Sequence, residues 1–386
     1  MSDNSQEKIP LWRDDRFWRV ALQVLAVAIF VALIIWLAIN FSRSEQGGRI
    51  NFSFLNKAAS FGIGEGLIPY NPSDPYKQAL LVGLVNSLRI TVLGIILTTI
   101  LGIAAGIASF SENWLLKQLN RVYVEVVRNT PLLLQLFFWY FAVFFNLPSQ
   151  DKRIEWLDSI YMSKSGVILP WPENKLMVWL WLIVLVGGAI ASIFIWRWRT
   201  KLMVERGVSG RPQLISLIVI GIAALLIIIF ALGWQTPKPI ETGEIVGGVK
   251  LTLEFSALLV GLVFYTGAFI AEIVRGGIEA VSKGQWEAAK SLGLKSGLVM
   301  RLVIFPQALR VIIPALNSQY ANLAKNSSLA IAIGFPDLYS VANTTYNQAG
   351  RPVEVFILLM VTYLSINLII SLTMNYLNKT VQFEER

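Results

Sequence analysis

The sequence predicts an all-α, polytopic membrane protein with about eight transmembrane helices. Of its 386 residues, 55% are hydrophobic and only 15% are charged, whereas about a quarter of the residues in a soluble domain are charged. Mean hydropathy is +0.59. Apolar segments recur along the chain, and many approach the length of about 20 residues that crosses a bilayer as a helix. These observations together indicate the fold class.

The predicted spans follow one another along the whole chain. They are residues 20–41, 90–110, 131–147, 176–196, 214–234, 253–273, 308–333 and 355–377. The first is longer than the apolar region of a cleaved signal peptide, about 7–15 residues, so we expect a retained anchor. Polar residues interrupt the seventh span, among them Asn317, Asn322 and Lys325.

Basic residues in the predicted loops indicate the orientation of the spans. Arginine and lysine concentrate in the N-terminal segment and in loops 111–130, 197–213 and 274–305, and the intervening loops are poorer in them or balanced by acids. This alternation fits the positive-inside rule with both termini in the cytoplasm. The net charge of +9 is therefore attributed to topology, and no binding of nucleic acid is expected.

The composition excludes several classes of catalytic and metal site. The chain has no histidine and no cysteine, so thiolate nucleophiles, histidine-based triads and the commonest metal ligand are absent. Glu254 and Glu272 would lie about 27 Å apart on one helix, too far for paired catalytic carboxylates. The sequence contains no G-x-x-x-x-G-K-[ST] phosphate loop. We therefore expect a non-enzyme without a metal or a nucleotide site of its own.

A polar segment, KGQWEAAKSLGL at residues 283–294, lies between two apolar spans in a predicted cytoplasmic loop. Its helix-forming residues predict a short helix in which Trp286, Ala289 and Leu292 share one side. Gly293 stands where a left-handed residue ends a helix. One interpretation is a solvated helix on the membrane surface. The other is a docking element for a second protein.

Motifs around this segment resemble those of a known family. Glu287-Ala288-Ala289 is followed by Gly293 and then by VIFP at residues 303–306. GAFIAEIVRGGIEAV precedes this motif, PQALRVIIPAL and LAKNSSLAIAIGFPDL follow it, and YVEVVRNTPLLLQLFFWYF lies upstream. Together they resemble the membrane subunits of binding-protein-dependent ABC importers, in the polar amino acid uptake group. Val303, Phe305 and Asn129 differ from the commonest residues of that pattern.

The resemblance covers residues 81–147 and about 251–380 and implies a type I importer permease core of five helices. The expanded, eight-span form is similar to the permeases of general L-amino-acid importers. The implied divisions are residues 1–80 with the first span and an external loop, 81–147 as the first part of the core, 148–250 with two extra helices, and 251–386 as the second part of the core, containing the EAA coupling loop at about 275–305.

The same resemblance implies the partners of the chain. It implies an ATP-driven amino acid importer in the lipid bilayer of a bacterial inner membrane, with ABC ATPase subunits that bind ATP and Mg²⁺. A second, homologous permease in a heterodimer and an external substrate-binding protein complete the assembly, and this chain holds no cofactor. The implied ATPase-coupling residues are Trp286, Glu287, Ala288, Ala289 and Gly293.

A polar substrate that crosses the bilayer requires polar side chains facing a protein-lined cavity. The candidates for this pathway are Glu254, Tyr265, Thr266, Asn317, Asn322, Ser327 and Ser328. Each also has a structural interpretation: a carboxylate near a span end can reach water, a threonine can bond its own helix, and asparagines join helices. The small residues of GIAAG at 102–106 predict close helix packing.

An ion-gradient-driven secondary amino acid transporter is the alternative function. Such transporters often consist of two matching repeats with interrupted helices at a midplane site. The sequence shows no such duplicated pair. The favoured hypothesis is therefore the permease subunit.

Overall fold

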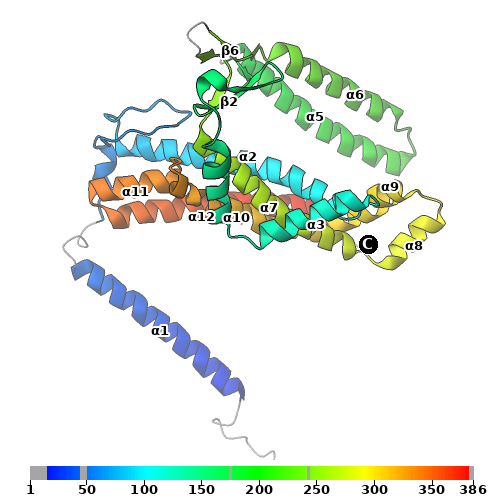
Figure 1. The fold of residues 1–386 in the computed structure, drawn as a ribbon. Helices are drawn as coiled ribbons and strands as arrows, with labels where there is room; N and C mark the ends of the chain where they lie inside the picture. Colours follow the sequence, from blue (N-terminus) through cyan, green and yellow to red (C-terminus); the bar gives the residue numbers. More distant parts are fainter. Residues whose placement is uncertain (1–14, 44–49, 174–175, 241–243, 382–386) are drawn as a thin grey trace, which may run out of the picture.

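The computed structural model describes residues 15–43, 50–173, 176–240 and 244–381. Most of them are helical, as predicted (Figure 1). The α-helices are α1 (Asp15–Arg43), α2 (Tyr76–Ala108), α3 (Trp114–Arg128), α4 (Leu132–Phe137), α5 (Leu176–Arg206), α6 (Arg211–Leu226), α7 (Leu253–Glu279), α8 (Lys283–Ser291), α9 (Ser296–Val299), α10 (Phe305–Asn326), α11 (Leu338–Ala349) and α12 (Pro352–Val381). The 3-10 and π segments are η2 (Ser53–Asn56), η3 (Phe138–Phe144), η4 (Gln150–Lys152), η5 (Ile227–Ala231), η6 (Met300–Ile304) and η7 (Ser327–Ile333).

The predicted number of eight spans is not confirmed. Within the described residues, six helices are long and apolar enough to cross a membrane: Tyr76–Ala108, Leu176–Thr200, Arg211–Ala231, Leu253–Glu279, Ser296–Ile333 and Pro352–Thr380. A seventh span results if Trp114–Arg128 and Leu132–Phe144, which are bent by 110° relative to each other, count as one. In the first predicted span, Val20–Leu33 is a shorter apolar helix.

Two helices extend into segments that the apolar pattern left as loops. α2 begins at Tyr76, directly after Pro75, well before the predicted start at residue 90. α3 fills most of the predicted loop 111–130, and its N-cap Asn113 accepts a 3.1 Å hydrogen bond from the Leu116 N–H. Neither extension is apolar along its whole length. An apolar pattern in the sequence therefore predicts only the apolar part of each helix.

Short antiparallel strands depart from the all-α prediction. Four of them form a sheet in the order β1-β2-β3-β8, and two further pairs are β4 with β5 and β6 with β7. The strands are β1 (Ile154–Trp156), β2 (Ile160–Ser163), β3 (Gly166–Leu169), β4 (Trp171–Pro172), β5 (Trp234–Gln235), β6 (Lys238–Pro239), β7 (Ile245–Val246) and β8 (Val249–Leu251). Pairing satisfies the backbone polar groups of these connecting segments where no helix does so.

Helix α7 is the centre of the bundle, with α2, α3 and α10 around it (Figure 1). Its residues Ile270, Val274 and Ile278 are fully buried and pack with Ile304 and Ile312. Gly102 and Gly106 of α2 face Ile270 and Val274 so closely that a Cβ atom on either glycine would overlap them. The close packing predicted for GIAAG at 102–106 is therefore confirmed.

The two extra helices lie outside this bundle. α5 and α6 form a hairpin and pack on each other, beside the core in Figure 1. The apolar windows of these two helices are 6% and 0% buried, against 61% for α7. The residues that build the core clusters therefore come mainly from α2, α4, α7, α10, α11 and α12 and from short segments beside them.

Candidate functional site

A polar cavity of about 240 Å³ lies between the middle of α7 and the C-terminal part of α10. We call it the central cavity. Successive lining residues lie one to four positions apart on each helix, at spacings that place each set on one helix face. They are Tyr265, Thr266 and Phe269 on α7 and Gln319, Asn322 and Asn326 on α10. The lining offers amide and hydroxyl groups and carries no charged side chain, so it can hydrogen-bond a polar solute without neutralising a charge on it.

The structure brings together three of the seven residues predicted for the substrate pathway, namely Tyr265, Thr266 and Asn322. The hydroxyl groups of two others form hydrogen bonds with the backbone three residues earlier. Ser327 donates to the carbonyl of Ala324 at 2.8 Å, and Ser328 donates to that of Lys325 at 2.7 Å. The buried Oδ1 of Asn317 has no hydrogen-bond partner among the described residues. Gln319 and Asn326, two further polar residues of the same predicted span, complete the lining on α10.

Glu254, the last of the seven predicted residues, lies in the first turn of α7. It lines a cavity of about 400 Å³ together with Thr252, Ser340 and the loop at residues 61–65. Tyr140 donates a 2.9 Å hydrogen bond to the Glu254 Oε1 atom. We call this the Glu254 cavity, and it is distinct from the central cavity.

The loop at residues 61–65 is held in place by polar side chains of the bundle. Arg89 Nη1 lies 2.7 Å from Glu65 Oε1, and both side chains are nearly buried. The Thr252 hydroxyl donates to Glu65 Oε2. Asn86 donates to the carbonyl oxygens of Glu65 at 2.8 Å and Pro336 at 2.9 Å. Sequence reasoning missed this arrangement, because the partners come from distant segments and share no local motif.

Apolar packing separates the Glu254 cavity from the central cavity. Between Glu254 and Tyr265, α7 carries the buried residues Leu258 and Leu262, which pack with the buried Leu136 of α4. A Cβ atom on Gly261 would lie 2.6 Å from Leu136 Cδ2, so α4 lies directly on the α7 backbone there. The half of α7 that begins at Glu254 is thus closed against α4.

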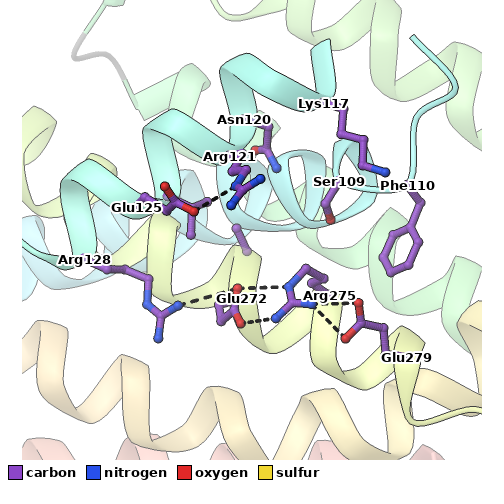
Figure 2. Close-up of a pocket in the computed structure, with 12 residues that line it drawn as sticks. Ser109, Phe110, Lys117, Asn120, Arg121, Glu125, Arg128, Glu272, Arg275 and Glu279 are labelled. Carbon is purple, nitrogen blue, oxygen red and sulfur yellow. Dashed lines mark hydrogen bonds and ion pairs between the residues drawn. The ribbon is translucent and has the colours of Figure 1, made fainter. Parts of the chain in front are cut away.

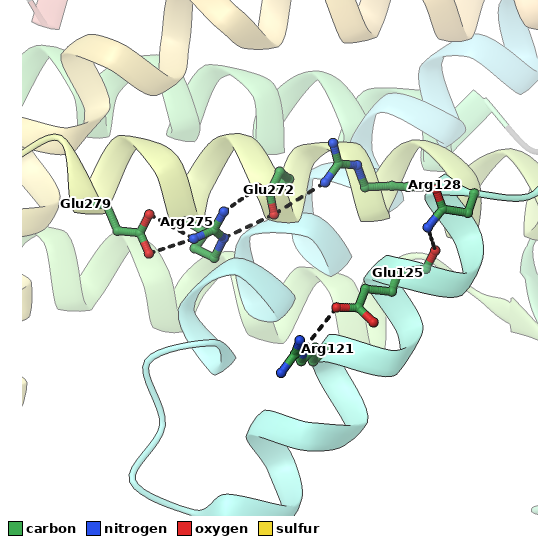
Figure 3. Close-up of polar contacts among 7 residues, drawn as sticks. Arg121, Glu125, Arg128, Glu272, Arg275 and Glu279 are labelled. Atoms are coloured by element: carbon green, nitrogen blue, oxygen red, sulfur yellow. Dashed lines mark hydrogen bonds and ion pairs between the residues drawn. The ribbon is translucent and has the colours of Figure 1, made fainter.

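A third cavity, of about 550 Å³, lies at the C-terminal end of α7, between α7, α3 and the end of α2 (Figure 2). We call it the charged cavity. On its α7 side a ladder of charges alternates in sign. Arg275 donates to both oxygens of Glu272 and, through Nη1, to both oxygens of Glu279 at 2.7 and 2.8 Å. This bidentate geometry fixes the Glu272 and Glu279 carboxylates (Figure 3).

Helix α3 brings a second set of charges to the charged cavity. Arg121 and Glu125 form an exposed pair at 2.9 Å. Arg128, at the end of α3, lies 3.6 Å from Glu272 Oε2, a distance of an ion pair and not of a hydrogen bond. Its guanidinium carbon also lies 5.5 Å from the centre of the Phe269 ring. Since Phe269 lines the central cavity, Arg128 stands between the central and charged cavities.

The predicted helix around the EAA motif is confirmed as α8. Ala289 is buried, and Trp286 is half-buried against the core cluster around Val299 and Ile304, while Glu287 and Ala288 are exposed. Gly293 has φ +74°, the left-handed conformation predicted for the end of this helix.

Leu292, expected on the same side of the helix as Trp286 and Ala289, does not pack against the core with them. Its side chain is 80% exposed. The helix already ends at Ser291, and Leu292 is its C-cap residue with φ −77° and ψ 5°. The chain therefore begins to turn at Leu292, so helical periodicity no longer predicts the direction of its side chain.

Known proteins resemble this chain over most of its length. The family described as binding-protein-dependent transport system inner membrane component matches residues 213–383. YhdX of Escherichia coli (strain K12) is 41% identical over 370 residues, which cover 94% of this chain and 94% of YhdX. AapQ of Rhizobium johnstonii, a general L-amino acid transport system permease protein, is 41% identical over 384 residues, covering 97% of this chain and 94% of AapQ. BztB of Rhodobacter capsulatus, a glutamate/glutamine/aspartate/asparagine transport system permease protein, is 38% identical over 408 residues, covering 97% and 96%.

Proposed function

Because this chain belongs to the family of inner membrane components of binding-protein-dependent transport systems, as a permease of amino-acid ABC transporters, we propose that polar amino acids cross the membrane through its central cavity. The chain lies in a bacterial inner membrane with both termini in the cytoplasm. The C-terminal end of α7 then faces the cytoplasm and the Glu254 cavity faces outward. The membership argues against the alternative of a secondary transporter.

The observation that carries this proposal is the position of the central cavity. It collects hydroxyl and amide groups from the middle of α7 and the C-terminal part of α10, inside two candidate spans. Polar groups at that depth are costly unless they face protein or a solvated path. The apolar packing of Leu136 on Gly261 closes the outward side, whereas the charged cavity lies directly beyond Phe269. This arrangement supports a route from the central cavity toward the cytoplasm.

Energy for transport comes from separate ABC ATPase subunits, which bind ATP and Mg²⁺. Helix α8 is the element that docks on them. Trp286 and Ala289 anchor it to the core, and Glu287 and Ala288 remain exposed for contact. A motion of the ATPase would therefore be transmitted to η6 and α10, which contribute Ile304 and Ile312 to the same core cluster.

A second, homologous permease and an external substrate-binding protein complete the proposed assembly. Glu287→Lys is expected to remove the ATPase from the complex purified from its native membrane, because it reverses the exposed charge on α8. Lys295→Glu, beyond the end of α8, is the matched control and should leave the ATPase bound. Retention of the ATPase by Glu287→Lys would contradict the docking role.

Transport through the central cavity is tested with the purified complex in proteoliposomes that contain ATP, with binding protein outside. Uptake of ¹⁴C-labelled L-glutamine and L-glutamate is measured for Asn322→Ala and for Ser365→Ala, whose exposed hydroxyl donates to the Val361 carbonyl of its own helix. Asn322→Ala is expected to lower uptake about tenfold or more, the effect of removing one polar partner of a buried solute, while Ser365→Ala should transport normally. Equal uptake by the two variants would contradict the proposal.

A further inference from the structure

We propose that Arg128, at the C-terminal end of α3, binds the α-carboxylate of an amino acid that leaves the central cavity. This inference rests on the proposed function, since it names the part of the substrate that is recognised on the same route. The ligand class is an α-amino acid in its zwitterionic form, and the recognised group is common to all members of that class.

The guanidinium of Arg128 is available for a ligand. Among the residues that the structure describes, its carboxylate neighbour is Glu272 at 3.6 Å, and the Arg128 side chain is 40% exposed. Glu272 is already held on both of its oxygens by Arg275. Arg128 therefore makes one loose ion pair and keeps its planar set of N–H donors for another carboxylate, for which the guanidinium geometry is suited.

The position of Arg128 places those donors at the boundary of the central cavity. Its guanidinium lies over Phe269, 5.5 Å from the ring centre, and Phe269 lines the central cavity. Glu272 follows Phe269 by less than one helical turn and lines the charged cavity. Figure 3 shows Arg128 reaching from the end of α3 toward Glu272 on α7.

The chemistry of the central cavity explains why a charged partner is required. An amino acid at neutral pH carries a carboxylate and an ammonium group, and the cavity lining supplies only hydroxyls, amides and rings. Moving an ion past this lining without compensation is costly. Arg128 supplies the positive charge that compensates the carboxylate. A contact with this main-chain group accepts amino acids with different side chains.

A purely structural role is the competing explanation: Arg128 would only tie α3 to α7 through Glu272. The two roles predict different effects on the binding of two ligands. A carboxylate-binding arginine distinguishes an amino acid from an analogue that lacks the carboxylate, whereas a structural tie affects both ligands equally.

The test measures equilibrium binding to the purified transporter complex in detergent, without the external binding protein. The ligands are ¹⁴C-labelled L-glutamine and 4-aminobutanamide, its decarboxylated analogue, which is measured by competition. Arg128→Gln is expected to raise the Kd for glutamine about tenfold or more, the loss of one charge-assisted carboxylate contact, and to leave the Kd for the analogue unchanged. Arg128→Lys should restore part of the affinity, because it keeps the charge without the planar fork.

Arg121→Gln is the matched control. Arg121 lies on the same helix and lines the same cavity, but it is paired with Glu125 and is exposed. This variant should bind both ligands as the unmodified complex does. Size-exclusion profiles and ATPase content confirm that each variant is assembled.

The outcomes separate this inference from the proposed function. If Arg128→Gln binds glutamine normally, or if its affinity for both ligands falls equally, Arg128 does not bind the carboxylate. If Asn322→Ala loses binding in that case, the central cavity still stands as the pathway. If Asn322→Ala also binds normally, or if the unmodified complex retains no glutamine, both proposals are overturned.

Discussion

A Cβ atom on Gly106 of α2 would lie 2.5 Å from the Cβ atom of Val274 on α7 and 2.9 Å from the Ala271 carbonyl oxygen. The two helices therefore meet backbone to backbone, which a small residue alone permits. This contact positions α7, the helix that lines the central and charged cavities.

Gly106→Leu is expected to force α2 and α7 apart and to destabilise the protein by about 1–3 kcal/mol or more, as overpacking of a core does. Thermal unfolding of the purified protein in detergent measures the loss. Gly187→Leu on α5 is the matched control, since a Cβ atom there would meet nothing within 4 Å. A similar loss in both variants would mean that the contact is not the cause.

The Arg89–Glu65 pair is expected to hold the loop that walls the Glu254 cavity. The two side chains are only 12% and 10% exposed, and removing one partner leaves the other charge nearly buried, at a cost of about 3–5 kcal/mol. Glu65→Ala should therefore release residues 61–65, and limited proteolysis followed by mass spectrometry should detect cleavage there. Arg121 and Glu125 are 68% and 59% exposed, so Glu125→Ala should cost less than about 1 kcal/mol. Unchanged protection in Glu65→Ala would contradict this assignment.

The left-handed backbone at Gly293 is expected to set the direction in which α8 returns toward α9. Its φ of +74° costs a residue with a side chain about 1–2 kcal/mol. Gly293→Val should therefore displace α8 and lower the substrate-stimulated ATPase activity of the reconstituted complex, with normal membrane insertion. Gly284→Val, at a glycine outside the left-handed region, serves as the control. Full stimulation in Gly293→Val would show that this turn does not govern coupling.

The Asp337 carboxyl is expected to make stability depend on pH. Burial raises its pKa to about 6, against about 3.9 in an unfolded chain. Between these values the folded state binds a proton that the unfolded state has released, so stability falls as pH rises from about 4 to about 6, and the loss is complete above that window.

Asp337→Asn should remove this contribution, because an amide does not ionise yet retains an acceptor for the Ser340 N–H, now bonded at 2.8 Å. Unfolding temperatures of both proteins between pH 4 and pH 7 provide the measurement. The difference in unfolding temperature between the variant and the parent should grow with pH. Parallel curves would refute the assignment.

Local patterns in the sequence were sufficient for part of the fold and part of the site. The helix α8, the left-handed Gly293 at its end and the close packing at Gly102 and Gly106 follow from residue type and spacing, and the structure confirms each. Tyr265, Thr266 and Asn322 were named as polar residues on predicted spans, and they line one cavity. Their role in transport remains a prediction.

The class of the protein follows from local sequence features, because a long apolar run is stable only in a bilayer or a core and because periodicity along one helix is a local property. The tertiary structure alone decided which distant residues meet. The 110° bend between α3 and α4 brings Arg128 to Phe269 and Glu272, and Arg89 reaches Glu65 across separate segments. Such contacts depend on how helices are oriented in space, and residue spacing along the chain does not encode that orientation locally.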